Sequence, residues 1–369
     1  MNLFNKLFLI ILENEKNDHS DNYCTGRFGP EKHIKRFNLF NKLRFLNSHG
    51  YYHTEQCKQI SLLIWDLFKI YWENIEQTYQ LLKEEKSKSL YLLLLAFRVL
   101  GHRKIKLPFT PLNQQTIKLI ENSISQNDSL PSNWGSKHLH LHDFQYLGQR
   151  IRVYLTRGGP GNAFFLKQYH FKSTKRNVII APEEGDTVID CGVCWGDTTF
   201  EFACSVGKKG KVYAFEFIPF NLEVIQKNKE INPEISERIN VIDKAVWRES
   251  GKKVFFTDDG PGSSVKFESF DGAHGDCSTL SIDDLVTEQK VEKVDFIKMD
   301  IEGAEPHALF GATQTIQKFK PKLAISIYHN LNDFSSIAPW INDLGLGYKF
   351  YLKHCTIHSE ETVLFAHCI

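Results

Sequence analysis

The fold is decided by the stretch Val188-Ile189-Asp190-Cys191-Gly192-Val193-Cys194-Trp195-Gly196-Asp197-Thr198-Thr199. Residues 187–191 are apolar enough to predict a buried strand, two glycines follow in a turn, and residues 197–206 predict a helix. A strand that runs through a glycine turn into a helix is typical of a nucleotide-cofactor loop. We therefore expect an α/β fold with a cofactor site at this turn.

Two carboxylates flank the turn and indicate which cofactor it binds. Asp190 stands where a G-x-G-x-x-G loop has its first glycine, and Asp197 opens the following helix. Both would repel a pyrophosphate and suit a ligand that carries an ammonium group and a sulfonium centre. The predicted cofactor is therefore S-adenosylmethionine (SAM), bound by Asp190, Gly192, Gly196 and Asp197, and an NAD-dependent enzyme of the same architecture is the alternative.

From residue 187 onward, predicted strands and helices alternate. Strands are expected at 187–191, 211–216, 239–243, 294–299 and 322–328. Helices are expected at 197–206, 219–231, 281–289, 304–318 and 333–344, and a turn-rich excursion at 258–277. This alternation predicts a Rossmann-like, doubly wound parallel sheet with helices on both faces. Two last strands, 347–354 and 362–367, predict a terminal antiparallel hairpin at the sheet edge.

The first third of the chain has a different pattern. Residues 59–101 show helical spacing that ends at Gly101, whereas residues 1–55 show no sustained period. We expect a polar connector over 113–136 and then a hairpin over 139–155. The predicted organisation is a mainly helical region, 1–135, followed by a catalytic domain, 136–369.

The amino-acid composition limits the classes of protein to which this chain can belong. Hydrophobic residues make up 42% and charged residues 24%, and the net charge of +1 gives no general attraction to nucleic acid. No apolar run approaches the ~20 residues that cross a membrane, and Leu7–Leu12 lacks the cleavage site of a signal peptide. We interpret the scattered cysteines as the reduced thiols of a cytoplasmic protein: Cys24, Cys57, Cys204, Cys277, Cys355 and Cys368. The N-terminal helices are expected to pack as a cap or to form a homo-oligomer interface.

Acidic and basic residues at the ends of two further strands extend the predicted cofactor site. Glu216 ends the second predicted strand, about 20 residues past the glycine loop, where an acidic side chain can accept both ribose hydroxyls. Asp243 and Lys244 end the third strand, beside the expected adenine half of the crevice. An ordinary loop is the alternative interpretation of Asp243 and Lys244.

Acidic residues and a histidine follow the next two strands. Asp300 ends the strand at 294–299, and Glu302 and Glu305 follow it. Such carboxylates could accept a proton, orient a hydroxyl or hold a hard divalent cation such as Mg²⁺. His329 follows the strand at 322–328 and is the expected general base. The predicted catalytic residues are Asp300, Glu302 and His329, and the candidate metal ligands are Asp300, Glu302 and Glu305.

These segments resemble the FkbM-type SAM-dependent methyltransferases. The resemblance rests on the loop quoted above, on Phe215-Glu216-x-x-Pro219-x-Asn221, on Phe296-Ile297-Lys298-Met299-Asp300-Ile301-Glu302-Gly303-Ala304-Glu305 and on Gly311-Ala312. It covers about residue 139 to the end, and residues 79–101 look like a helical leader found before such domains. It implies a class I methyltransferase fold, with cofactor positions at Asp190, Gly192, Gly196 and Glu216 and an active-site string at Asp300 and Glu302. Some relatives need Mg²⁺. The chain departs from the family pattern at Cys191, Cys194 and Trp195.

The expected function is SAM-dependent O-methylation of a hydroxyl on a small molecule, sugar or glycan. His329 or a carboxylate would remove the hydroxyl proton, and the protein would align the reacting groups. A non-catalytic SAM-binding protein of the same fold is the other alternative.

Overall fold

The computed structural model describes residues 1–23, 54–173, 178–263 and 265–368. Its centre is a seven-stranded sheet in the order β8-β7-β6-β13-β14-β16-β15. The strands are β6 (Thr187–Cys191), β7 (Lys211–Glu216), β8 (Ile239–Asp243), β13 (Phe296–Met299), β14 (Lys322–Ser326), β15 (Tyr348–His354) and β16 (Thr362–Cys368). All run parallel except β16, which is antiparallel to both of its neighbours. The predicted α/β class and the alternation of elements are confirmed.

The order of the strands places a ligand crevice between β6 and β13. The chain moves outward from β6 to β7 and β8 and then returns to the other side of β6 at β13. Ligands of open α/β sheets bind at such a reversal, outside the carboxyl ends of the strands. The terminal hairpin is confirmed, but its antiparallel strand β16 lies one position inside the edge, since β15 forms the edge itself.

Helices cover both faces of this sheet, because successive strand residues point to opposite sides. Val188 packs with the face covered by α8 (Asp197–Ser205), α9 (Pro219–Glu230) and α10 (Pro233–Ser236). Ile189 packs with the face covered by α11 (Ile282–Glu288), α12 (Glu305–Phe310), α13 (Thr313–Phe319) and α14 (Leu331–Asp343). The helix expected at 304–318 is broken at Gly311, where a Cβ would lie 2.9 Å from the Cα of Arg248.

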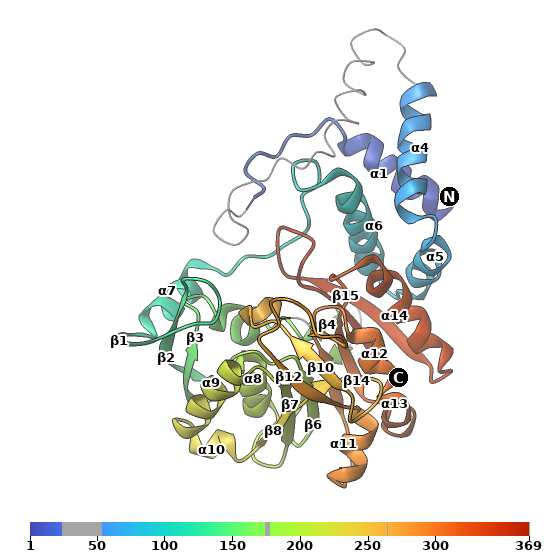
Figure 1. Cartoon of the computed structure of the whole chain (residues 1–369). Coiled ribbons are helices and arrows are strands. Elements are labelled where there is room, and N and C mark those ends of the chain that lie inside the picture. Colours follow the sequence, from blue (N-terminus) through green and yellow to red (C-terminus); the bar gives the residue numbers. More distant parts are fainter. Residues whose placement is uncertain (24–53, 174–177, 264, 369) are drawn as a thin grey trace.

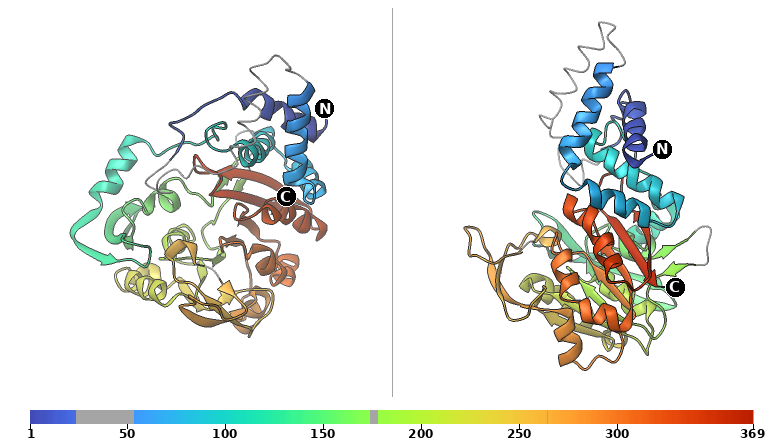
Figure 2. Two further views of the ribbon diagram at one scale, coloured as in Figure 1. Left: turned by 45° about the horizontal axis from the view of Figure 1, so that its top comes forward. Right: turned by 90° about the vertical axis from the view of Figure 1, so that its right-hand side faces the viewer.

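The N-terminal helices extend the same core beyond the edge of the sheet. They are α1 (Leu3–Asn14), α4 (Thr54–Phe68), α5 (Trp72–Leu81) and α6 (Glu85–Leu100), and they lie above β15 and α14 in Figures 1 and 2. Tyr91 of α6 stacks on Phe334 of α14 at 4.5 Å between ring centroids, and Thr78 of α5 donates a hydrogen bond to the carbonyl of Ser335. The helical prediction for this region is confirmed. The irregular segment expected over 1–55 was wrong for α1, and residues 24–53 lie outside the described residues.

The polar connector expected over 113–136 was wrong. It contains α7 (Gln114–Asn122) and β1 (Ile124–Pro131), and β1 pairs with β2 (His138–Tyr146), which pairs with β3 (Gln149–Leu155). Asn113 caps α7 by accepting a hydrogen bond from the backbone N–H of Thr116. The sequence pattern did not predict β1, because this strand is half exposed at the edge of its sheet and carries few apolar residues. The division proposed after residue 135 falls in the turn between β1 and β2.

The excursion after β8 is more ordered than its sequence suggested. It holds a four-stranded sheet, β11-β10-β12-β9, made of β9 (Ala245–Val246), β10 (Lys253–Phe256), β11 (Val265–Lys266) and β12 (Gly275–Leu280). The short elements η2 (Gly260–Gly262), η1 (Gly161–Phe165), β4 (Phe171–Lys172) and β5 (Ile179–Ile180) complete the described chain. In the described part of the chain, no helix combines the length and apolarity that crossing a membrane requires.

Candidate active site

The glycine loop brings β6 against the end of β13. Gly192 has φ +80°, and a Cβ there would overlap the carbonyl oxygen of Asp300 and lie 2.9 Å from its carbonyl carbon. The amine of Lys298 donates hydrogen bonds to the carbonyls of Gly192 and Cys191, at 2.6 and 3.2 Å. Gly196 has φ +93° and caps α8. Only glycine allows this close approach, so the loop can join the two strands at the reversal point.

Asp190 has a different role from the one expected. Its side chain is fully buried and does not line the cavity at this edge of the sheet. Its Oδ1 lies 3.2 Å from the amine of Lys298, and its Oδ2 accepts hydrogen bonds from the hydroxyls of Thr198 and Thr199. Burial lowers the pKa of Lys298, but the charges of Asp190 and nearby carboxylates raise it above its ordinary value. Asp190 therefore fixes the loop and cannot select a cationic ligand by direct contact.

The carboxylate beside the glycine loop that does face the cavity is Asp197. Burial raises its pKa to about 6, against the charge of Lys298. The side chain of Asp197 accepts a hydrogen bond from the backbone N–H of Thr198, 2.9 Å away. Of the two carboxylates that were expected to favour a cationic ligand, Asp197 is therefore the one that faces the cavity.

Glu216 closes the second strand and points into the same cavity. Its Oε1 accepts hydrogen bonds from the backbone N–H groups of Phe217 and Ile218, at 2.8 and 2.9 Å. Burial raises the pKa of Glu216 to about 7, although these N–H groups lower it. Lys244 also lines the cavity, whereas Asp243 is exposed and lies outside it. Asp243, a predicted cofactor residue, is therefore not brought to the site.

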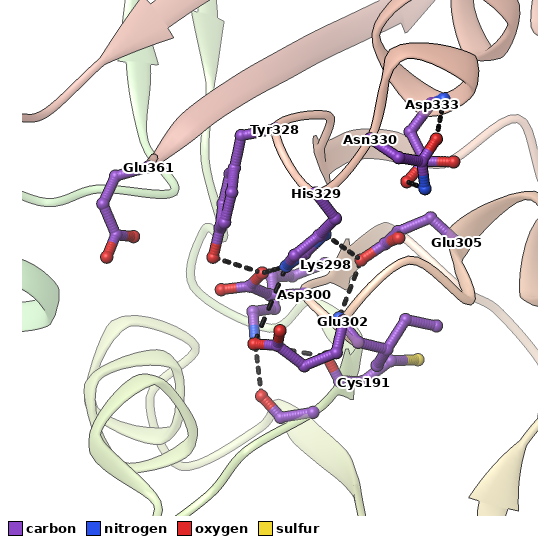
Figure 3. Close-up of polar contacts among 12 residues, drawn as sticks. Cys191, Lys298, Asp300, Glu302, Glu305, Tyr328, His329, Asn330, Asp333 and Glu361 are labelled. Carbon is purple, nitrogen blue, oxygen red and sulfur yellow. Dashed lines mark hydrogen bonds and ion pairs between the residues drawn. The ribbon is translucent and has the colours of Figure 1, made fainter. Parts of the chain in front are cut away.

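Asp300 and Glu302, which follow β13, both line the cavity, and Figure 3 shows their contacts with neighbouring side chains. Two tyrosine hydroxyls donate to Asp300: that of Tyr169 at 2.6 Å to Oδ2 and that of Tyr328 at 3.0 Å to Oδ1. Glu302 has φ +56°, a backbone conformation that favours glycine, and its side chain is 35% exposed. Asp300 is therefore held in place, whereas Glu302 has an open side toward a ligand.

His329 lies among three carboxylates instead of on the cavity wall. Its Nε2 is 3.4 Å from Asp300 and 3.7 Å from Glu302, and its Nδ1 is 3.2 Å from Glu305. Burial lowers the pKa of His329, but the contacts with Glu302 and Glu305 and the charge of Asp300 raise it to about 11. The structure does not place His329, the predicted general base, on the cavity wall, because both ring nitrogens face carboxylates. Glu305 is fully buried behind the wall as well.

These residues surround one cavity of about 960 Å³ at the carboxyl ends of the strands. Its walls include six carboxylates: Asp197, Glu216, Asp300, Glu302, Glu360 and Glu361. Aromatic rings supply much of the remaining wall, among them Trp134, Tyr169, Trp195, Phe217, Trp247 and Tyr328. The turn 260–263 lines the cavity, and no described residue before Trp134 does. An acidic, aromatic cavity of this size suits a small cationic ligand together with a polar acceptor.

Sequence reasoning missed Tyr169 and Glu361. Tyr169 is 131 positions from the carboxylate that it contacts, and nothing in its local sequence indicates this meeting. Glu361 lies in the hairpin turn that was predicted only as a polar loop, and its carboxylate accepts a hydrogen bond from Gln168. Tyr328 stood directly beside the histidine that was singled out. It could have been found from its place at the end of a strand.

The comparisons with known proteins agree with this architecture. Residues 190–350 match the methyltransferase FkbM domain family. The crystal structure of methyltransferase FkbM from Methylobacillus flagellatus KT is similar at 19% identity and a TM-score of 0.50. The match covers 80% of this chain but 58% of that one, so the chain spans little more than half the length of that protein. No curated protein gives a significant match.

Two further solved structures are similar over shorter parts. The fibrillarin of Aeropyrum pernix, in complex with natively bound S-adenosyl-L-methionine, is 14% identical with a TM-score of 0.36, covering 63% of this chain and 90% of its own. An O-methyltransferase from Bacillus cereus, in complex with SAH, is 13% identical with a TM-score of 0.34, covering 50% and 74%. The family match confirms the sequence resemblance over residues 190–350, the part of the chain that corresponds to a methyltransferase FkbM domain.

Proposed function

We propose that this protein is a SAM-dependent O-methyltransferase that acts on a hydroxyl of a small molecule, sugar or glycan. The observation that carries the proposal is one cavity lined both by Glu216, at the end of β7, and by Asp300 and Glu302, which follow β13. The FkbM family match supports methyl transfer, and the acidic wall supports a cationic methyl donor.

The residues present fit SAM. Glu216 lines the cavity, and two backbone N–H groups hold its Oε1, so its carboxylate is fixed where it can accept ribose hydroxyls. Phe217 and Val246 provide apolar wall for an adenine, and Asp197 and Asp300 provide negative charge for the methionine end. A pyrophosphate would meet the same carboxylates unfavourably, which argues against the NAD alternative. When bound, SAM supplies an electrophilic methyl group.

Side chains of the protein would accept the proton of the acceptor hydroxyl and align its oxygen. Glu302 lines the cavity and is 35% exposed, so this carboxylate would accept the proton of an acceptor hydroxyl in the proposed reaction. Asp300 is fixed by the hydroxyls of Tyr169 and Tyr328, so it can orient the acceptor. Alignment of the acceptor oxygen is the main contribution expected from these walls.

The first test measures SAM binding by Glu216→Ala beside Asp243→Ala. The two carboxylates are register partners at the ends of β7 and β8, but only Glu216 lines the cavity. We expect at least tenfold weaker binding by Glu216→Ala, because hydrogen bonds to a charged group contribute about 1.5–3 kcal/mol each. Asp243→Ala should bind like the wild type. Equal affinities of all three proteins, or tight NADH binding by the wild type, would remove the cofactor assignment.

The second test follows labelled methyl groups from SAM into a pool of sugars, glycans and small hydroxylated compounds, with mass spectrometry of the products. Glu302→Gln should lower kcat by about 10²–10⁴-fold and leave SAM affinity unchanged. Tight SAM binding without transfer to any acceptor would favour the non-catalytic alternative.

The proposal also covers the location, the assembly and the acceptor class of the protein. We also propose a cytoplasmic location, which the free thiols of the described cysteines support; Cys24 and the side chain of Cys57 lie outside the described residues. A homo-oligomer through the N-terminal helices draws on Leu62 and Trp65 of α4, whose side chains are about half exposed. The near-neutral net charge argues against a nucleic-acid acceptor.

A further inference from the structure

The histidine behind the cavity wall is surrounded by more negative charge than it can balance. Asp300, Glu302 and Glu305 all approach the ring of His329 within 3.7 Å (Figure 3). Lys298, a cation whose charge acts on Asp300, already pairs with Asp190 and donates to two backbone carbonyls. Buried like charges that lack compensation are costly, so a further positive charge would stabilise this group.

Atoms in the cluster are also left without hydrogen-bond partners. Neither ring nitrogen of His329 has a hydrogen bond of good geometry, and the side chain is only 8% exposed. Glu305 is fully buried, and its Oε2 has no partner either. Buried polar atoms are nearly always satisfied, and an exception calls for an explanation such as a bound ion. These atoms point to a ligand that the side chains themselves do not supply.

The fold brings the donors together from neighbouring elements. Asp300 follows β13, His329 follows the adjacent parallel strand β14, and Glu305 is the first residue of α12. The left-handed backbone at Glu302 and Gly303 turns the chain back between Asp300 and Glu305. One donor atom each from Asp300, Glu305 and His329 lies within 4.8 Å of the other two. Within the described ranges, this is the one group of three such side chains with that spacing.

We propose that Asp300, Glu305 and His329 bind one divalent first-row transition metal ion, with Mn²⁺ as the representative. Two carboxylates and an imidazole form a mixed oxygen and nitrogen donor set, which suits such ions better than Mg²⁺, whose ligands are almost all oxygen. The site differs from the one expected from sequence, because His329 takes the place of Glu302. Asp300 and Glu302 also line the cavity, which gives the ion a path of entry.

The site does not depend on methyl transfer, so it can be tested without SAM or an acceptor. Metal-free protein is titrated with Mn²⁺, and free Mn²⁺ is followed by electron paramagnetic resonance. We expect one bound Mn²⁺ per chain, and at least tenfold weaker binding by His329→Ala and by Glu305→Gln. His138→Ala is the matched control, because His138 is an exposed histidine on β2 outside the cluster, and it should bind as the wild type does.

A second measurement needs no variant and remains valid if a substitution prevents folding. Electron spin-echo modulation of the Mn²⁺-bound wild type should show coupling to an imidazole nitrogen. The absence of saturable Mn²⁺ binding, the absence of nitrogen coupling, or unchanged binding by both cluster variants would each overturn the site. Displacement of Mn²⁺ by equimolar Mg²⁺ would overturn the choice of ion. Methyl transfer is assayed separately, so a failure of the proposed function would leave the metal result standing.

Discussion

Substituting Gly192 by alanine should separate the two loops that meet at the reversal point of the sheet. At φ +80° an alanine costs about 1–2 kcal/mol, because its Cβ meets the following carbonyl in the left-handed region. The same Cβ would overlap the carbonyl of Asp300 and lie 2.9 Å from Cγ2 of Ile301. Overpacking of this kind costs about 1–3 kcal/mol more. The expected loss of unfolding free energy is therefore about 2–5 kcal/mol.

Gly148 provides the matched control for this prediction. It has φ +74°, and an added Cβ would meet nothing within 4 Å. Gly148→Ala should therefore lose only the conformational part, about 1–2 kcal/mol. Denaturant unfolding followed by tryptophan fluorescence would measure both variants, and calorimetric titration would measure SAM affinity. Equal destabilisation of the two variants, with unchanged SAM affinity in Gly192→Ala, would refute the close-contact argument.

Two further predictions concern buried charges. The pKa of Glu216 is raised from 4.5 to about 7, so the folded state binds the proton more tightly and stability should fall by about 3 kcal/mol as the pH rises through this window. Glu216→Gln should remove that part of the pH dependence, and identical unfolding curves of variant and wild type at pH 5 and pH 8 would contradict it. Lys298→Met should cost about 3–5 kcal/mol, because it leaves Asp190 buried without its partner. Lys293→Met removes an exposed ion pair and should cost less than about 1 kcal/mol in the same thermal unfolding assay.

Periodicity and turn chemistry were enough to predict the elements of the sheet. Strands β6, β7 and β8 were expected with the bounds that the structure shows, because their residues are apolar and glycine or charged turns flank them. The strand β1 and the short strands β9, β10 and β11 were missed. They carry polar residues or span only two to four positions, so no period could be recognised.

The sequence by itself determined which residues stand at the carboxyl ends of the strands, since chain position alone places Glu216, Asp300 and Glu302 there. Only the tertiary structure decided what each carboxylate faces. Asp190 is turned inward to Lys298, while Asp197, seven positions later, is open to the cavity. The reason is that charge compensation and burial depend on neighbours from distant parts of the chain, such as Lys298 for Asp190 and Tyr169 for Asp300. A sequence pattern does not show which distant residues become neighbours when the chain folds.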